Sequence, residues 1–291
     1  MLGLTAALVL GGCVKSASLG FVAVRTGPFH SCALSAGGSV QCWGRSSYDR
    51  TRPPESTSAI SIAVGWANGC ATAAGGVAWC WGNDDYGQSS PPDEAWASIS
   101  TGFSHSCGQM VEDGWICWGD DSYGQLEVPP GMSSLSPGYA GTCGLNEDAG
   151  VACWGMPVWD GGGIPEGRFV KVDAGPEEGC ALGEDGDLRC WGYWTLNGVL
   201  ADSYAGPFVD FALGYSHVCG LRTSGLIACW GWPEDGRTLA PSGTFSAIGG
   251  GNGSSHTCAI SDVGELTCWG LDADGQCDVD PWPEGNDAAG R

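Results

Sequence analysis

One skeleton recurs from one end of this chain to the other, and it constrains the fold more than any other feature of the sequence. Each copy has a Gly, a Cys five residues later, a second Cys ten residues after the first, and Trp-Gly directly after the second Cys. The first cysteines are Cys32, Cys70, Cys107, Cys143, Cys180, Cys219 and Cys258. The second cysteines are Cys42, Cys80, Cys117, Cys153, Cys190, Cys229 and Cys268. Because no copy breaks the spacing, the chain is predicted to consist of seven equivalent units of 36 to 39 residues.

The segment between paired cysteines is predicted to be a β-hairpin. In the first unit, the short runs 30–34 and 40–44 flank a Gly-bearing turn, and symmetric folding sets Cys32 opposite Cys42. Directly opposed residues in a non-hydrogen-bonded antiparallel pair have α-carbons about 4.5 Å apart, which a disulfide can bridge. We therefore predict seven disulfides, each stabilising its hairpin by about 2–3 kcal/mol in the chain-entropy model.

Zinc binding is the alternative use of spaced cysteines. Zinc sites usually place two ligands within about two to four residues of each other, and no two cysteines here are that close. Fourteen of the sixteen cysteines are predicted to form disulfides, which favours an oxidising compartment and therefore an exported protein.

A third short apolar run precedes each hairpin, with its larger residues three positions apart. The pairs are Phe21/Val24, Ala59/Ile62, Trp96/Ile99, Met132/Leu135, Phe169/Val172, Phe208/Phe211 and Phe245/Ile248. Residues three apart on a strand point to opposite faces, so both faces of each sheet must be buried. Units too small to bury their own faces are typical of solenoids and propellers, and short antiparallel sheets favour the propeller. The predicted fold is all-β, a single seven-bladed β-propeller over residues 21–277.

These residues resemble the regulator of chromosome condensation repeat family. Its unit has a Gly, a His-Ser-x-Ala-Leu strand, a Gly turn, a Trp-Gly strand and a trailing Gly-Gln. Segments 30–34 with 42–44, and 105–107 with 117–119 and 124–125, carry the resemblance best. It implies a seven-bladed propeller, and units this short resemble bacterial members such as the propeller-type β-lactamase inhibitory protein. The chain departs from the pattern at Asn68, Gly141 and Glu178, which replace the His.

Both ends of the chain lie outside the repeats. Residues 1–12 are predicted to be a signal peptide of the lipoprotein type, because an apolar run too short to span a membrane ends in small residues. Leu10-Gly-Gly-Cys13 resembles a bacterial lipobox and makes Cys13 the predicted lipidation site; the alternative is a hydrophobic N-terminus without export function. Residues 13–20 are predicted to be a tether, and residues 278–291 an acidic, flexible tail.

Two questions about the end of the ring stay open in the sequence. The blades can close aligned, or staggered so that residues 21–24 complete the last blade. Cys277 follows the last unit, and we expect a thiol there rather than an intermolecular bridge.

The sequence offers no catalytic or metal-binding motif. All four histidines, His30, His105, His217 and His256, occupy one repeat position, two before the first cysteine. A residue repeated around a ring usually belongs to the fold, so we expect structural histidines bonded to the neighbouring backbone rather than a metal ring in the channel. The Trp of each Trp-Gly is expected to pack between blades. Residues 272–280 carry several aspartates but lack the spacing of a calcium loop, so no metal or other cofactor is predicted.

Net charge limits the class of partner. At −22, with only two lysines, the chain has no basic groove for a phosphate backbone, so nucleic-acid binding is excluded. We expect a monomer that contacts a membrane only through its lipid anchor.

The segment after each Trp-Gly varies from unit to unit and collects large aromatics. The predicted binding residues are Tyr48, Tyr86, Tyr123, Trp159, Trp194 and Trp232. Acidic neighbours are Asp84, Asp85, Asp120, Asp121, Asp160, Glu234 and Asp235. Since Tyr and Trp are enriched in binding hot spots, one rim is predicted to bind a protein with a basic surface. The alternatives are aromatics that fold back over the blade edge, a structural envelope protein, a lyase or hydrolase at the channel mouth, and a binding face on the opposite rim.

Overall fold

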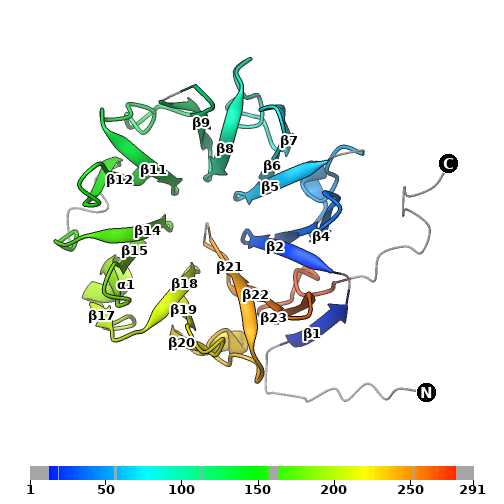
Figure 1. Cartoon of the computed structure of the whole chain (residues 1–291), viewed down its shortest axis with the longest axis vertical. Helices are drawn as coiled ribbons and strands as arrows, with labels where there is room; N and C mark the ends of the chain where they lie inside the picture. Colours follow the sequence, from blue (N-terminus) through cyan, green and yellow to red (C-terminus); the bar gives the residue numbers. More distant parts are fainter. Residues whose placement is uncertain are drawn as a thin grey trace.

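The computed structural model describes residues 13–18, 20–55, 58–112, 114–156, 163–251 and 253–279. In these residues seven antiparallel β-sheets stand in a ring around a central axis (Figure 1). The chain is therefore a seven-bladed β-propeller, as the repeats predict, and each repeat builds one blade.

Every blade has an inner, a middle and an outer strand. Blade 1 consists of β2 (Phe21–Thr26), β3 (His30–Ser35) and β4 (Val40–Gly44). Blade 2 consists of β5 (Ala59–Val64), β6 (Asn68–Ala73) and β7 (Ala78–Gly82). Blade 3 consists of β8 (Trp96–Thr101), β9 (His105–Met110) and β10 (Trp115–Gly119). Blades 4 and 5 consist of β11 (Met132–Pro137), β12 (Gly141–Asn146) and β13 (Val151–Gly155); and β14 (Phe169–Ala174), β15 (Glu178–Gly183) and β16 (Leu188–Gly192). Blades 6 and 7 consist of β18 (Phe208–Leu213), β19 (His217–Arg222) and β20 (Ile227–Gly231); and β21 (Phe245–Gly249), β22 (His256–Ser261) and β23 (Glu265–Gly270).

Two blades carry a fourth strand outside the outer one. In blade 5 it is β17 (Ser203–Tyr204), and in blade 7 it is β1 (Cys13–Ser18). Among the described residues, three short helical turns follow outer strands: η1 (Ser47–Asp49), α1 (Tyr193–Leu196) and η3 (Glu234–Gly236).

The seven predicted disulfides are confirmed, one in each blade. The middle and outer strands pair so that Cys32 lies opposite Cys42, and the same register recurs in every blade. The paired α-carbons are 4.0 to 4.1 Å apart. The paired large residues of the inner strands are buried, with Phe21 2% and Val24 1% exposed. They do not lie on opposite faces as predicted: Phe21 pairs with Ser35 and Val24 with Ala33, two residues apart on β3, so a β-bulge between them places both side chains on one face.

The tryptophan of Trp-Gly joins neighbouring blades, which confirms its predicted packing role. A buried indole N–H needs an acceptor, and here it is a backbone carbonyl of the preceding blade's connecting segment. Trp43 donates to Gln276 O at 2.8 Å, across the ring closure. The same bond runs from Trp81 to Arg50 O, from Trp118 to Gln88 O, from Trp154 to Gln125 O and from Trp269 to Arg237 O, at 2.9 to 3.1 Å.

The histidines are structural, but their partners differ from the prediction. The imidazoles were expected to bond neighbouring backbone; instead Nε2 of three of them bonds a hydroxyl of the next blade, one residue before that blade's first cysteine. His30 differs, because the next blade has Gly69 at that position. His105 Nε2 lies 2.8 Å from Thr142 Oγ1, and His256 Nε2 lies 2.6 Å from Ser31 Oγ. His217 makes the same contact with Thr257 at 2.8 Å.

The ring closes with aligned blades, because β2 pairs with the hairpin of its own repeat. Residues 13–20 were predicted to be a tether, and this is wrong for 13–18: as β1 they pair with β23, from Cys13 opposite Gly270 to Ser18 opposite Glu265. The open edge of β23 offers unpaired backbone groups, which β1 satisfies. The predicted signal peptide at 1–12, and the predicted tail from residue 280 on, lie outside the described residues.

Cys277 lies inside the molecule near the ring closure. It is fully buried in a cluster with Phe21, Trp43 and Leu266, against which Val279 also packs. A buried sulfur does not reach a second chain, which argues against an intermolecular bridge.

Candidate functional site: the loop face

The two ends of the propeller axis carry different parts of each blade. The loop face consists of the loops between inner and middle strands, such as 27–29, and the segments after the outer strands, such as 45–50. The turn face consists of the hairpin turns between middle and outer strands, such as 36–39, and the starts of the inner strands. On the loop face, Arg45 N donates to Phe29 O at 2.8 Å. The equivalent backbone bond recurs in every blade, so the segments after Trp-Gly do share one rim.

Three blades build this rim with the same turn. In blade 2, Asp84 Oδ1 accepts the Ser89 N–H at 2.7 Å, and Gln88 Oε1 accepts the Tyr86 N–H at 3.0 Å. Between them Gly87 adopts φ 82°, which favours glycine. Blades 3 and 7 repeat both side-chain bonds. In blade 3 Asp121 accepts the Leu126 N–H and Gln125 accepts the Tyr123 N–H. In blade 7 Asp272 accepts the Cys277 N–H and Gln276 accepts the Asp274 N–H. The first Asp and the Gln are therefore structural, whereas the residue before the Gly is Tyr in two blades and Asp in the third.

Most of the predicted aromatics are exposed on the loop face. Tyr48 is 61% exposed, Tyr86 56%, Tyr123 53% and Trp232 42%. Trp194 differs: it is half-buried and packs edge-on against Tyr193 and Tyr215, with ring centroids 5.1 and 5.5 Å away. Trp159 and Asp160 lie outside the described residues.

A second group of aromatics on this face was missed by the sequence analysis. The inner-to-middle loops of blades 1 to 4 bring together Phe29, Trp66, Phe103 and Tyr139, hereafter the aromatic arc. Trp66 contacts Phe29 and Phe103 at centroid distances of 5.5 and 4.7 Å, and Phe103 contacts Tyr139 at 4.4 Å. A signal was present in the repeats: Trp66, Phe103, Tyr139 and Tyr215 all directly follow the Gly five residues before a first cysteine.

The loop that joins β21 to β22 covers the centre of the loop face. It is longer than its equivalents, with the seven residues 250–256 replacing the five residues 26–30. A Cβ added at Gly253 would lie 2.8 Å from Pro176 Cγ and 3.5 Å from Trp66, so this loop reaches from blade 7 to blades 2 and 5. Figure 1 shows the end of β21 directed toward the axis.

Beneath this loop the inner strands surround a cavity of about 300 Å³. Arg25, Lys171 and Asp173 are its charged lining residues. Burial raises the pKa of Asp173, and its carboxylate accepts the Ser136 hydroxyl at 2.9 Å. Lys171 Nζ donates to Asp210 at 2.6 Å and to Phe211 O at 2.7 Å.

Glu178 is the other buried carboxyl with a raised pKa. It occupies the repeat position of the histidines, where burial and then the neighbouring Glu177 raise its pKa well above the ordinary value. In the next blade Val218 stands where four blades have a Ser or Thr hydroxyl, so Glu178 has no hydroxyl partner at that position. Glu178 lies between blades 5 and 6, whereas Asp173 lines the cavity. The two groups thus have separate structural settings.

The aspartates on the rim accept hydrogen bonds from neighbouring groups. Burial opposes ionisation of Asp120, but hydrogen bonds from Ser122, Ser104 and Gln125 together hold its pKa below the usual value. Asp84, Asp85 and Asp121 are exposed. Cations occur in blade 1, where Arg45 lies over Phe29 and pairs with Asp274 at 2.7 Å. Over the described residues, no group of three His, Cys, Asp or Glu side chains is arranged to hold a metal ion.

The fold and this face define a disulfide-bonded repeat propeller with an aromatic and acidic end. Residues 21–50 and 208–237 match the family model described as the Regulator of chromosome condensation (RCC1) repeat. The CRINKLY WD40 ectodomain of the Arabidopsis thaliana receptor kinase ACR4 is similar to this chain at 25% identity and a TM-score of 0.68, covering 86% of this chain and 97% of its own. The ectodomain of Physcomitrella patens receptor kinase CR4 is 27% identical, with a TM-score of 0.60 and coverage of 72% and 61%.

Prp20p from Saccharomyces cerevisiae has the same fold, with 13% identity, a TM-score of 0.66 and coverage of 86% and 82%. No curated protein sequence matches the chain. Within the described residues, no helix has the length and apolar character needed to cross a membrane.

Proposed function

We propose that this protein is an exported, monomeric, non-enzymatic propeller of the bacterial cell envelope, of the short-repeat type. It binds another protein with a basic surface through the aromatic and acidic residues of the loop face. One observation carries the proposal: the turn that presents Tyr86 and Tyr123 is built equally well with Asp274 in blade 7. The fold therefore does not require exposed tyrosines, and recognition accounts for them.

The arrangement of side chains supports a protein partner. Tyr48, Tyr86 and Tyr123 project from a rigid rim, with the aromatic arc on the same face. Exposed Tyr and Trp on a rigid scaffold are typical of protein-binding surfaces. A relative of the same fold, Prp20p, has binding properties toward Gsp1p and histones. The exposed aspartates of the rim match a basic partner.

Two other functions fit the structure less well. A structural envelope role would leave the exposed tyrosines without a purpose. A lyase or hydrolase would need groups with shifted pKa values that converge on one point. The two carboxyls with raised pKa, Asp173 and Glu178, instead occupy separate sites, and Asp173 is hydrogen-bonded to Ser136.

We expect Tyr86→Ala and Tyr123→Ala to weaken binding by at least about tenfold, because truncating an aromatic anchor typically costs about 2 kcal/mol or more. The partner is recovered by affinity purification of the intact protein, and binding is measured by calorimetry or surface plasmon resonance. Raising salt should slow association, since the rim charges steer the encounter.

Asp274→Ala is the matched control, because it truncates the same turn position in blade 7. It should change affinity much less than the tyrosine variants. If the tyrosine variants keep full affinity but melt at a lower temperature, these side chains pack against the blade and the proposal fails.

The seven disulfides indicate an oxidising, extracytoplasmic environment. A lipid anchor at Cys13 is the finer part of the proposed location. Wild-type protein should take up a fatty-acid probe and sediment with membranes, and Cys13→Ser should lose both properties. Cys277→Ser is the control that should keep the label. Equal labelling of wild type and Cys13→Ser would remove the anchor from the proposal.

A further inference from the structure

Every inner strand carries a β-bulge at its second residue, on the turn face. In blade 1, Phe21 pairs with Ser35 and Ala23 with Leu34, so Val22 has no opposite residue. The same register shift occurs in the other six blades. The bulge residues in chain order are Val22, Ile60, Ala97, Ser133, Val170, Val209 and Ser246.

The bulge does not need an aliphatic side chain. In blades 4 and 7 a serine occupies it, and the hydroxyls of Ser133 and Ser246 donate to Leu145 O and Ile260 O, at 3.1 and 3.3 Å. In blade 3 the residue is Ala97. The remaining four blades expose a large aliphatic side chain to solvent: Val22 by 54%, Ile60 by 61%, Val170 by 60% and Val209 by 53%.

The hairpin turns of the same face add four more exposed aliphatics. Val77 is 53% exposed, Val111 58%, Leu226 52% and Val263 81%. We call these eight residues the aliphatic ring: Val22, Ile60, Val77, Val111, Val170, Val209, Leu226 and Val263. Single exposed aliphatics are common on protein surfaces, but here they recur at the bulge position and in the hairpin turns of one face.

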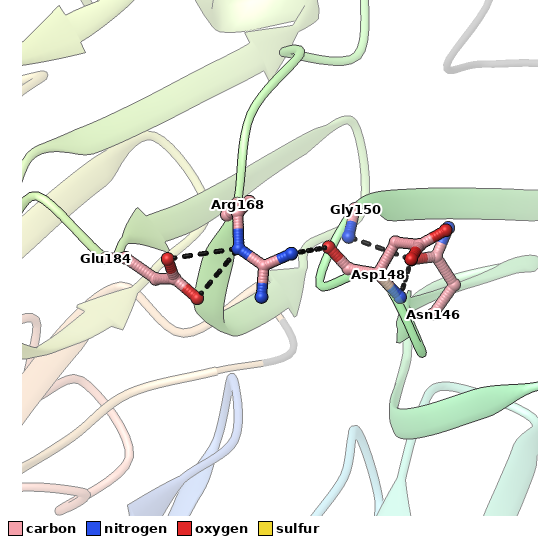
Figure 2. Close-up of polar contacts among 5 residues, drawn as sticks. All are labelled: Asn146, Asp148, Gly150, Arg168 and Glu184. Carbon is pink, nitrogen blue, oxygen red and sulfur yellow. Dashed lines mark hydrogen bonds and ion pairs between the residues drawn. The ribbon is translucent and has the colours of Figure 1, made fainter.

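Backbone hydrogen bonds make the turn face rigid: in blades 1, 4, 5 and 6 the turn is bonded to the segments that begin the inner strands on both sides of it. Gly38 O accepts the Ala59 N–H of the next blade at 2.9 Å, and Ala36 N donates to Gly20 O at 3.2 Å. Figure 2 shows a side-chain version between blades 4 and 5: Arg168 donates to Glu184 at 3.1 Å and to Asp148 O at 2.9 Å. A rigid surface loses little conformational entropy when it binds.

The charge on the turn face is negative. Exposed carboxylates stand in the turns of four blades at Glu112, Glu147, Glu184 and Asp262. The cations of the blade 5 region are already paired, Arg168 with Glu184 and Arg189 with Asp185. An occupant must therefore bring apolar side chains to the ring and positive charge to its edge.

We propose that the turn face is a second docking surface, on which the aliphatic ring binds a protein segment that combines aliphatic with Lys or Arg side chains. The acidic turns disfavour an anionic membrane, and the net charge of −22 disfavours a second copy of the chain. This surface lies opposite the loop face and does not depend on the function proposed there.

The test uses the intact protein and a fluorescent peptide of alternating leucine and lysine as the probe. The variant replaces Val22, Ile60, Val170 and Val209 by serine, the residue that blades 4 and 7 already have at the bulge, so the fold should be retained. We expect the wild type to bind the peptide, and the serine variant to bind at least about tenfold more weakly, with a melting temperature close to that of the wild type. The control Ala97→Ser, at the bulge of blade 3, should bind as the wild type does.

Three results would overturn the proposal. The first is a wild type that does not bind the peptide, and the second is a well-folded serine variant that binds with unchanged affinity. The third is equal binding of a leucine–glutamate peptide, which would remove the role of the acidic turns. Vesicles of neutral phosphatidylcholine form a separate arm; binding to vesicles without binding to the peptide would assign the ring to a lipid surface and contradict a protein partner.

Discussion

The completely reduced protein should be unfolded already near room temperature. It should therefore show no cooperative transition on heating. Each disulfide closes a short hairpin and contributes about 2–3 kcal/mol in the chain-entropy model. A single domain has only roughly 5–15 kcal/mol of stability in total. Even if the seven contributions are far from additive, their sum is comparable with the whole stability of the propeller.

The disulfides should not be reduced at the same rate. The first cysteine of every pair is buried, so access to each bond depends on the second one. Where the outer strand is the blade edge, as at Cys42 and Cys117, the second cysteine is half-buried. In blades 5 and 7 the fourth strands β17 and β1 cover the outer strand, and Cys190 and Cys268 are only 4% and 0% exposed.

Partial reduction followed by alkylation and mass spectrometry measures this order. Cys180–Cys190 and Cys258–Cys268 should be the last to be alkylated in the native state, and the order should disappear in urea. Deleting residues 13–18 should bring Cys258–Cys268 into the fast group, while Cys180–Cys190 stays slow. Free thiols in the native protein at the fourteen paired positions would contradict both the fold and the oxidising compartment.

The number of blades and their disulfides could be predicted because they depend on spacing. A ten-residue interval between cysteines determines the hairpin register, and the Trp-Gly pair marks the outer strand in every repeat. A repeated position also indicates a structural role, which is why the histidines and the tryptophans were correctly assigned to the fold. What the histidines bond could not be predicted, because their hydroxyl partners belong to the next blade.

Features that depend on contacts between distant segments were not predicted. β1 pairs with a strand about 250 residues later in the chain, and no local pattern in residues 13–18 announces that partner. The aromatic arc forms only because three-residue loops of four blades converge near the axis. The exposed bulge residues were not predicted for a different reason. An aliphatic residue in an apolar run is expected to be buried, and only the register shift of the inner strand turns its side chain toward solvent.

The two faces of the propeller differ in the residues that vary between equivalent positions. On the loop face a shared turn presents Tyr in blades 2 and 3 but Asp in blade 7. On the turn face a shared bulge presents Val or Ile in four blades but Ser in two. Because the local backbone is the same in each comparison, the chain itself shows which side chains the fold can do without, and these are the ones to test for binding.

Acid should destabilise the propeller through its histidines. Burial lowers the pKa of His30, His217 and His256 from 6.5 to about 3, and that of His105 to about 4. At a pH between the folded-state and the unfolded-state pKa, the histidines bind protons in the unfolded chain but not in the folded protein. The stability that the neutral histidines contribute is therefore complete above pH 6.5 and is lost as the pH falls. At about pH 5 each histidine should have lowered the free energy of unfolding by up to roughly 2 kcal/mol relative to neutral pH.

Two buried carboxyls act in the opposite direction. Burial raises the pKa of Glu178 and of Asp173, so their contribution is complete at low pH and is lost as the pH rises above the ordinary carboxyl range. Glu178→Gln should therefore be more stable than the wild type at pH 7 and equal to it at low pH. The acidic surface also repels itself less as it is protonated, which opposes acid unfolding.

A matched variant separates the histidines from these other groups. His217→Asn places at this position the residue that blade 2 has at Asn68, and an amide does not titrate in this range. Urea unfolding between pH 7 and 5 should show a shallower loss of stability for the variant than for the wild type, by about the contribution of one histidine. Because Asn also changes the contact with Thr257, its stability at pH 7 can differ from that of the wild type; the slope with pH is the diagnostic quantity. Identical slopes for the two proteins would mean that His217 is protonated as readily in the folded state as in the unfolded chain, and that its burial between blades does not control its charge.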